Sequence, residues 1–165
     1  MRALACGLIV LLLAGCGARR ALPPPGSPPS LKAPPNEALS LEAFASGVQI
    51  YECRARQWAL KAPEAELADR DGRKIGRHYA GPTWEANDGS SVVGELRARE
   101  NARSADDIPW LLLSAKSASG SGTLGRTKSI QRMDTVGGKA PPEPCKDGDE
   151  SRVPYKATYY FYRTK

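Results

Sequence analysis

The chain of 165 residues has a single histidine, His78, and no pair of cysteines with the spacing C-x-x-C. One histidine and few cysteines leave too few nitrogen and sulfur ligands for a zinc site. The missing C-x-x-C argues against a thiol redox centre, and the missing G-x-S-x-G argues against the nucleophile elbow of a serine hydrolase. We therefore expect no metal site and no cofactor.

No unbroken apolar run reaches the roughly 20 residues that a membrane-spanning helix needs. A shorter apolar run, Ala3–Ala14, follows the positive start Met1-Arg2, as in the core of a secretory signal. It ends in Leu13-Ala14-Gly15-Cys16, which resembles a bacterial lipobox. The resemblance implies cleavage before Cys16 and its acylation, and two or more acyl chains anchor a protein firmly to a membrane. An ordinary secretory signal with an incidental cysteine is the alternative.

The segment that follows the apolar run indicates a cellular location and a spacer. Gly17 stands where an aspartate would resemble an inner-membrane retention signal, so we expect an outer-membrane lipoprotein that faces the periplasm. With residues 1–15 removed as the signal, residues 16–38 contain half of the 14 prolines and little apolar surface. Such a composition cannot offset ordering entropy, so we expect a disordered, extended tether. Residues 39–165 remain as one domain.

The charge of this domain argues against nucleic acid as a partner. Without Arg2, Arg19, Arg20, Lys32 and Glu37 the formal net charge falls from +6 to about +3. The basic residues are scattered among acidic ones and form no stripe along the sequence. We expect the membrane, through the lipid anchor, to be one partner, and a small molecule or an envelope component to be another.

Short strand-like segments with turn residues between them predict an all-β fold. Asp71-Gly72 and Asp88-Gly89 are strong hairpin signals, because glycine allows positive φ. Only Glu37–Ala45 looks weakly helical. We expect a sandwich or barrel of about seven to nine short antiparallel strands. The predicted strands are Gly47–Cys53, Gln57–Leu60, Glu64–Arg70, Arg73–Ala80, Thr83–Asn87, Ser91–Ala98, Pro109–Ala115, Arg126–Val136 and Tyr155–Tyr162.

Two cysteines, Cys53 and Cys145, remain in the domain. In an oxidising envelope such a pair usually forms a disulfide, which would close a loop of about 90 residues. Two free buried thiols are the alternative.

Five sequence blocks resemble the domain of unknown function numbered 3455, which occurs in secreted bacterial and fungal proteins. The resemblance covers nearly all of Ser46 to Tyr162 and implies a secreted address. The family has no established activity, so it supplies no catalytic residues. Both domain cysteines lie inside matching blocks, which supports the disulfide. The blocks are "GVQIYEC", "IGRHYAGPTWEANDGSSVVGE", "DIPWLLLSAK", "SIQRMDTVGGKAPPEPC" and "VPYKATYYFY".

The stretch Ile75–Glu95 holds the candidate catalytic residues His78, Glu85 and Asp88. A histidine beside carboxylates can act as a general base or acid, because its unperturbed pKa is near 6.5. Alternation along the strand places the His78 side chain on one face of the strand and the side chains of Arg77 and Tyr79 on the other. The alternative is a structural interpretation, in which these residues form a strand and a turn. Aspartate is common in turns in any case.

Aromatic residues supply the candidate ligand-binding positions. We consider His78, Tyr79, Trp84 and Trp110 as a binding surface, with packing in the core as the alternative. The run Tyr155–Tyr162 is also more typical of core and covered edge than of a groove.

Two further patterns favour structural interpretations. Gly120–Gly125 matches G-x-G-x-x-G, yet no helix follows it, so a hairpin loop is favoured over phosphate binding. Asp147–Glu150 lacks the spaced ligand set of a calcium loop.

These observations predict a lipid-anchored envelope protein whose β-domain binds a ligand or is structural. An envelope enzyme of the hydrolase type, using His78 with Glu85 or Asp88, is the alternative.

Overall fold

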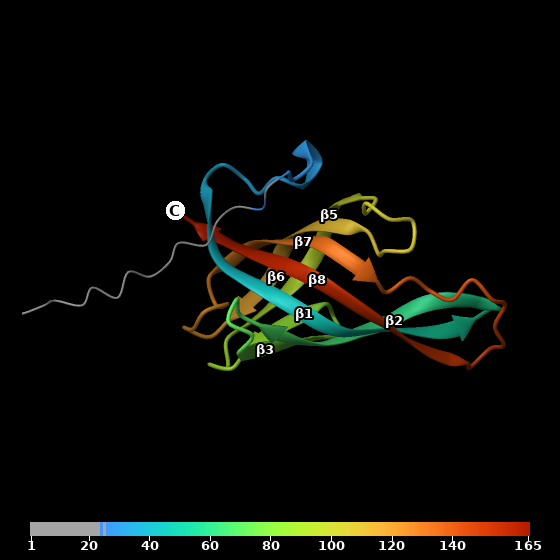
Figure 1. Cartoon of the computed structure of the whole chain (residues 1–165). Coiled ribbons are helices and arrows are strands. Elements are labelled where there is room, and N and C mark those ends of the chain that lie inside the picture. The colour runs from blue at the N-terminus through green and yellow to red at the C-terminus, as the bar shows by residue number, and fades with distance from the viewer. Residues whose placement is uncertain (1–23, 25) are drawn as a thin grey trace, which may run out of the picture.

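The computed structural model describes Pro24 and residues 26–165, in which eight antiparallel strands close into one barrel (Figure 1). Each strand pairs with the next along the chain, and the first pairs with the last. The all-β prediction is confirmed, and of the two architectures the barrel is correct. The elements are η1 Pro29–Leu31, β1 Glu37–Arg54, β2 Gln57–Ala68, β3 Lys74–Tyr79, β4 Thr83–Ala86, β5 Ser91–Glu100, β6 Trp110–Ser119, β7 Thr127–Gly137 and β8 Glu150–Thr164.

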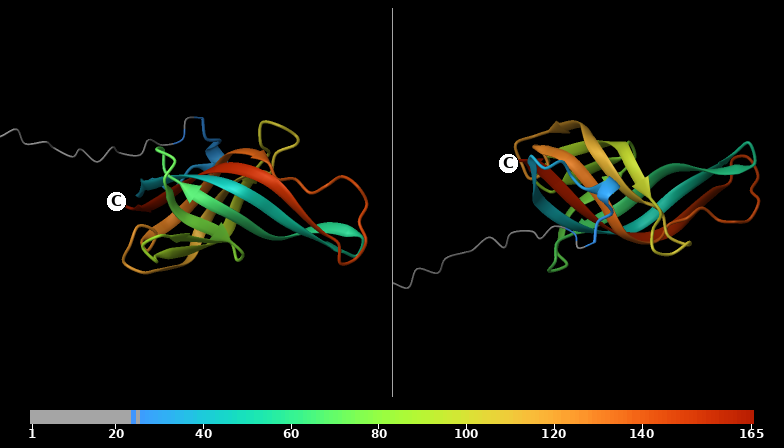
Figure 2. Two further views of the ribbon diagram at one scale, coloured as in Figure 1. Left: turned by 60° about the horizontal axis from the view of Figure 1, so that its bottom comes forward. Right: turned by 90° about the horizontal axis from the view of Figure 1, so that it is seen from above.

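Strands β1, β2 and β8 continue past the barrel as an arm, made of the β1–β2 hairpin and the loop between β7 and β8 (Figure 2). A disulfide between Cys53 and Cys145 joins the two parts of this arm, with 5.9 Å between their Cα atoms. Trp58 adds a hydrogen bond of 3.1 Å from Nε1 to the carbonyl of Glu143. The predicted disulfide is confirmed.

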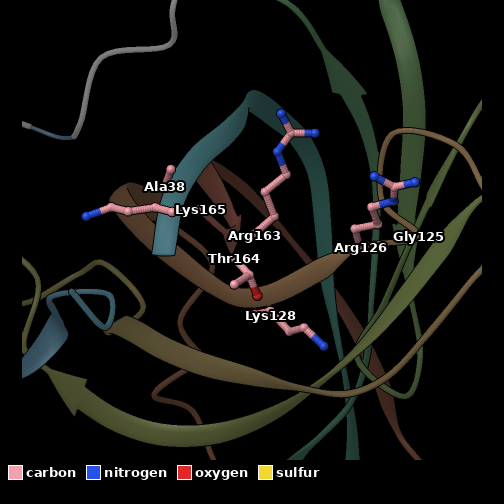
Figure 3. Close-up of a pocket in the computed structure, with 7 residues that line it drawn as sticks. All are labelled: Ala38, Gly125, Arg126, Lys128, Arg163, Thr164 and Lys165. Atoms are coloured by element: carbon pink, nitrogen blue, oxygen red, sulfur yellow. The ribbon is translucent and has the colours of Figure 1, made fainter. Parts of the chain in front are cut away.

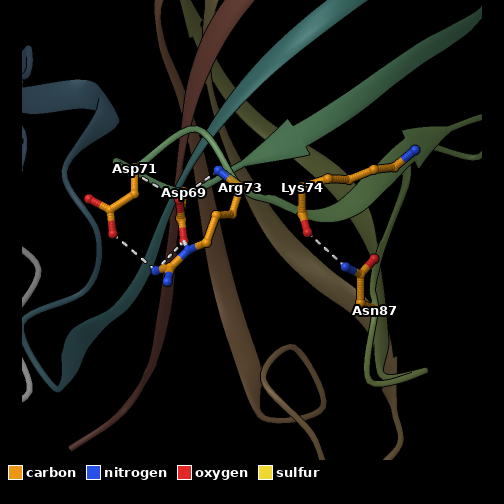
Figure 4. A network of polar contacts seen from close by, with 5 residues as sticks. All are labelled: Asp69, Asp71, Arg73, Lys74 and Asn87. Carbon is orange, nitrogen blue, oxygen red and sulfur yellow. Dashed lines mark hydrogen bonds and ion pairs between the residues drawn. The ribbon is translucent and has the colours of Figure 1, made fainter.

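Both predicted Asp-Gly hairpins are present, with Gly72 and Gly89 at φ +78° and +80°. In the first, the carboxylate of Asp69 accepts hydrogen bonds from the backbone N–H of Asp71 and of Arg73 and from the Arg73 side chain (Figure 4). Asn87, in the second hairpin, donates to the carbonyl of Lys74 at 2.8 Å. Short-range polar contacts thus fix the first turn, and the Asn87 contact joins the second hairpin to the start of β3.

The weakly helical prediction for Glu37–Ala45 is wrong, because this segment is the first half of β1. Its register with β8 begins at Glu37 opposite Thr164 and places Ala43 opposite Tyr159. Pairing with a strand far away in sequence overrides the local preference of an alanine-containing segment. Small side chains are needed there, because Ala43 and Ala45 face the barrel interior beside large aromatic rings.

The folded unit begins before residue 39, inside the segment predicted to be a tether. Leu31 of η1 is fully buried and packs on the outer face of the barrel. Its carbonyl accepts a hydrogen bond from the amide of Gln131, whose oxygen in turn accepts the Tyr162 hydroxyl at 2.5 Å. Composition predicts no internal structure for this segment, but Leu31 docks it on an apolar patch. The patch consists of Trp110, Met133, Tyr160 and Tyr162.

The apolar run at β6 packs on both faces of the sheet. Leu113 belongs to the interior core, whereas Trp110 and Leu112 pack in the outer cluster beneath Leu31. The aromatic run of β8 alternates in the same way, with Tyr159 and Phe161 inside. Within the described residues no helix is long and apolar enough to cross a membrane.

Candidate functional site

His78 and Trp84 face each other across the β3–β4 hairpin, inside the barrel. They are partners in the register of the two strands, and their side chains are 3% and 1% exposed. The rings stack with centroids 4.3 Å apart and planes within 8° of each other. The rings of Tyr159 and His78 meet edge to face, with centroids 5.2 Å apart. The sequence thus correctly separates His78 from Arg77 and Tyr79 by strand alternation.

The imidazole of His78 is neutral at physiological pH. Burial lowers its pKa to about 3, against the opposing effect of its hydrogen bond with Thr83. Nδ1 lies 2.8 Å from the carbonyl of Thr83, so Nδ1 carries the proton and donates. The ring is therefore a packed, uncharged group and is poorly suited to general acid–base catalysis near neutral pH.

Glu85 lies on the outer face of the same hairpin, opposite to His78. Its carboxylate accepts hydrogen bonds from the Tyr79 hydroxyl at 2.8 Å and from Arg77 at 2.9 Å. These two contacts lower the pKa of Glu85. Arg77 also lies 5.1 Å from the centroid of the Tyr79 ring. The structure does not bring Glu85 and Tyr79 together with His78, so these residues form no histidine–carboxylate pair.

The carboxylate of Asp88 is fully engaged by hydrogen bonds in a turn. It accepts hydrogen bonds from the N–H and hydroxyl of Ser90 and from the N–H and hydroxyl of Thr123. These donors hold its pKa far below the usual range for aspartate. Asp88 thereby joins the β4–β5 turn to the loop at Gly120–Gly125. That loop connects β6 to β7, as the sequence predicts, and no helix follows it.

Trp110 lies outside the barrel, in the cluster beneath Leu31. The guanidinium of Arg103 covers its ring at 5.2 Å from the centroid. Of the four predicted ligand-binding residues, only His78 and Trp84 therefore share one surface.

That shared surface belongs to a cavity of about 270 Å³ in the barrel interior. Its walls are mostly apolar, and Leu111 and Leu113 form part of them. Three polar residues from distant strands complete it, namely Gln49 of β1, Arg132 of β7 and Tyr159 of β8. Leu60, Lys61 and the Gly81-Pro82 turn line its open side and are exposed to solvent. Eight-stranded barrels have an interior that is either filled by side chains or holds one small ligand.

Several polar atoms in this interior have no hydrogen-bond partner among the described residues. They include the amide nitrogen of Gln49, the hydroxyl of Tyr159 and the indole nitrogen of Trp84, whose side chains are all at least 98% buried. Such groups are rare in folded proteins and costly unless they are paired. Burial raises the pKa of Tyr159, so the phenol keeps its proton.

Arg132 brings a positive charge into this interior. Its Nε and Nη2 donate to the carbonyl of Pro109 at 3.1 and 2.8 Å, which fixes the guanidinium. Its charge lowers the pKa values of His78, Tyr155 and Tyr159, against the larger effect of burial on the two tyrosines. The field of Arg132 therefore reaches all three rings.

Sequence reasoning missed Gln49, Arg132 and Tyr159 as members of one site. Each lies on a predicted strand, and alternation alone gives the two possible faces. The register places Arg132 opposite Tyr159, whereas Gln49 lies further along β1, opposite Val153, and reaches the same cavity.

A second hollow, of about 610 Å³, lies at the end of the barrel opposite the arm (Figure 3). Arg126, Lys128, Arg163 and Lys165 line it, are exposed, and form no ion pair with any described residue. Such a surface attracts anions, but solvent and salt screen its charges. It contains no buried polar group in its lining, unlike the interior cavity.

Residue Cys16, the predicted acylation site, lies outside the described residues. Within Pro24 and residues 26–165, no three histidine, cysteine, aspartate or glutamate side chains gather where they could hold a metal ion.

Comparison with known proteins identifies a family but no characterised relative. Searches of curated proteins and of solved structures found no significant match. The family model described as "Protein of unknown function (DUF3455)" matches residues 34–163, which includes all eight strands almost completely. The chain belongs to this family of proteins of unknown function.

Proposed function

We propose that this protein is a lipid-anchored envelope protein whose barrel binds a small molecule in its interior. The observation that carries the proposal is the cavity beside His78 and Trp84, in which apolar walls surround buried polar atoms without partners. Ligand sites of proteins are typically concave and mostly apolar, with a few convergent polar groups. At about 270 Å³ the cavity suits a ligand smaller than a typical drug.

The proposed cellular location rests on the sequence. The lipobox-like Leu13–Cys16 supports acylation of Cys16 and attachment to the outer membrane on its periplasmic side. The Cys53–Cys145 disulfide agrees with an oxidising compartment. Because residues from Leu31 onward belong to the folded unit, the chain between the anchor and the barrel is shorter than composition suggests.

Binding is favoured over hydrolysis. His78 is neutral and buried, and the carboxylates of Glu85 and Asp88 are engaged elsewhere. A hydrolase would need a nucleophile and a base within hydrogen-bond reach of each other, and the interior polar groups described above supply no such pair.

Binding can be tested by NMR on the chain from residue 17 onward, which contains the whole folded unit. Because His78 is the only histidine, its ring signals are unambiguous. We expect compounds from a small-molecule library or envelope extract to shift these signals. Ala62→Leu, at a half-buried position lining the cavity, should weaken the response.

Ala59→Leu is the matched control, because Ala59 is also half-buried on β2 but does not line the cavity. A response that both variants retain would place the ligand elsewhere. A His78 ring that no compound perturbs would leave the barrel with a structural role.

A further inference from the structure

The interior cavity contains hydrogen-bond donors and a positive charge but no carboxylate in its lining. The unpartnered nitrogen atoms of Gln49 and Trp84 can only donate, and the Tyr159 phenol keeps a proton to donate. A ligand that satisfies them must offer acceptor atoms.

Arg132 determines the sign of charge that the cavity prefers. A guanidinium has five N–H donors. Pro109 accepts from Nε and Nη2, and the guanidinium also lies close enough to the Tyr159 hydroxyl to lower its pKa. Lys61 is the other charged residue in the lining, but it lies exposed at the open side and pairs with Glu150 at 2.7 Å. A half-buried guanidinium without a carboxylate partner is costly, and an anionic acceptor compensates it best.

Most of the remaining lining of the cavity is apolar, including Leu111, the β6 partner of Arg132. Leu113 and Pro63 also belong to it, and the ring of Trp84 adds a flat surface. A ligand that fills this space therefore needs an apolar body as well as its polar group.

We propose that the cavity binds a small organic acid, with its carboxylate at Arg132 and Tyr159 and its apolar body against Leu111, Leu113 and Trp84. This proposal rests on the proposed binding function and specifies the class of ligand. Planar guanidinium groups bind carboxylates with two parallel hydrogen bonds, which also orients the ligand.

The test is a comparison of matched probes by calorimetry and by the His78 NMR signals. Benzoate, phenylacetate and octanoate are compared with their neutral primary amides and alcohols, which have similar shape. We expect the acids to bind at least tenfold more tightly than their neutral counterparts. Arg132→Met should remove most of this preference, and Tyr159→Phe should weaken acid binding several-fold.

Arg126→Met is the matched control, because it removes one cation of the second hollow and leaves the interior unchanged. If Arg126→Met rather than Arg132→Met abolished acid binding, the anion site would be the second hollow and the proposal would be wrong. Retention of the Trp84 ring signals shows that each variant is folded. If Arg132→Met does not fold, Tyr159→Phe still tests the proposal.

The pH dependence of binding gives an independent readout. Between about pH 4 and pH 8 the interior groups keep their charge: the pKa of His78 is about 3, those of Tyr155, Tyr159 and Lys61 are raised, and arginine stays protonated. Affinity should therefore fall only where the ligand's own carboxyl group takes up a proton, near pH 4.

Two outcomes separate this proposal from the binding function. Equal affinity for acids and neutral probes would overturn the ligand class while leaving the cavity as a binding site. No response to any acid would also overturn it, and the library screen described above would then decide the binding function by itself.

Discussion

The ring of His78 lies flat against the ring of Trp84, and burial there lowers the histidine pKa to about 3. In the unfolded chain the same imidazole has a pKa of about 6.5. The unfolded state thus binds a proton that the folded state does not, and His78 opposes folding increasingly as the pH falls below about 6.5. The change continues down to about pH 3, where both states are protonated.

We expect this one residue to lower the free energy of unfolding by about 1.6 kcal/mol between pH 6.5 and pH 5, with a slope that approaches about 1.4 kcal/mol per pH unit at the acid end. Urea unfolding of the wild type and of His78→Gln at several pH values measures it. The variant should show a flatter dependence over this interval. Parallel curves for the two proteins would mean that His78 is solvated.

Leu31 should be a major contributor to stability although it lies in a proline-rich segment. Because it is fully buried against the outer cluster, Leu31→Ala should cost about 2–5 kcal/mol in the free energy of unfolding. Leu96→Ala is the control, because Leu96 is 52% exposed and should change stability by less than about 0.5 kcal/mol. Chemical denaturation distinguishes the two, and equal effects would contradict the docking of η1.

Removal of the Cys53–Cys145 disulfide should destabilise the whole barrel. The cysteines are 92 residues apart, and closing a loop of that length is worth about 4–5 kcal/mol in the chain-entropy model. We expect a reductant to lower the guanidinium midpoint of the wild type to that of the variant with both cysteines replaced by serine. The reductant should leave that variant unchanged; a fall in its midpoint would show that the reductant acts in another way.

Gly122 and Asp88 should be energetically coupled. A Cβ atom at Gly122 would overlap the Asp88 carboxylate, so Gly122→Ala should destabilise by about 1–3 kcal/mol through overpacking. In an Asp88→Ala background the overlap is absent, and the added methyl group should cost much less. Thermal unfolding of the two single variants and the double variant measures the coupling, with the exposed neighbour Ser121→Ala as a control. Additive effects would contradict the contact.

The sequence predicts the strands of this fold well where the signal is local. The hairpins at Asp71-Gly72 and Asp88-Gly89 follow from turn chemistry, and His78 is assigned to the opposite face from Arg77 by alternation. The first half of β1 is missed because its strand conformation depends on β8, which lies more than 100 residues further along the chain. The choice between sandwich and barrel stays open at the level of sequence for the same reason, since closure depends on the register of distant strands.

The candidate site could be predicted only in part. His78 and Trp84 come from one hairpin, so a local pattern brings them together. Gln49 and Arg132 carry no local signature, since a polar residue on a strand usually faces solvent. Their inward orientation follows from the closed register of β1 with β8 and of β7 with β8.

The pairing of β1 with β8 also sets the order in which the barrel can be completed. Seven of the eight strand pairs join neighbours in sequence, whereas this one joins the two ends of the domain. Until β8 is available, β1 and β7 both present an open edge with unpaired backbone groups, which can template association with other chains. Pairing of β8 with β1 and β7 is therefore the step that converts an aggregation-prone sheet into a barrel without edges.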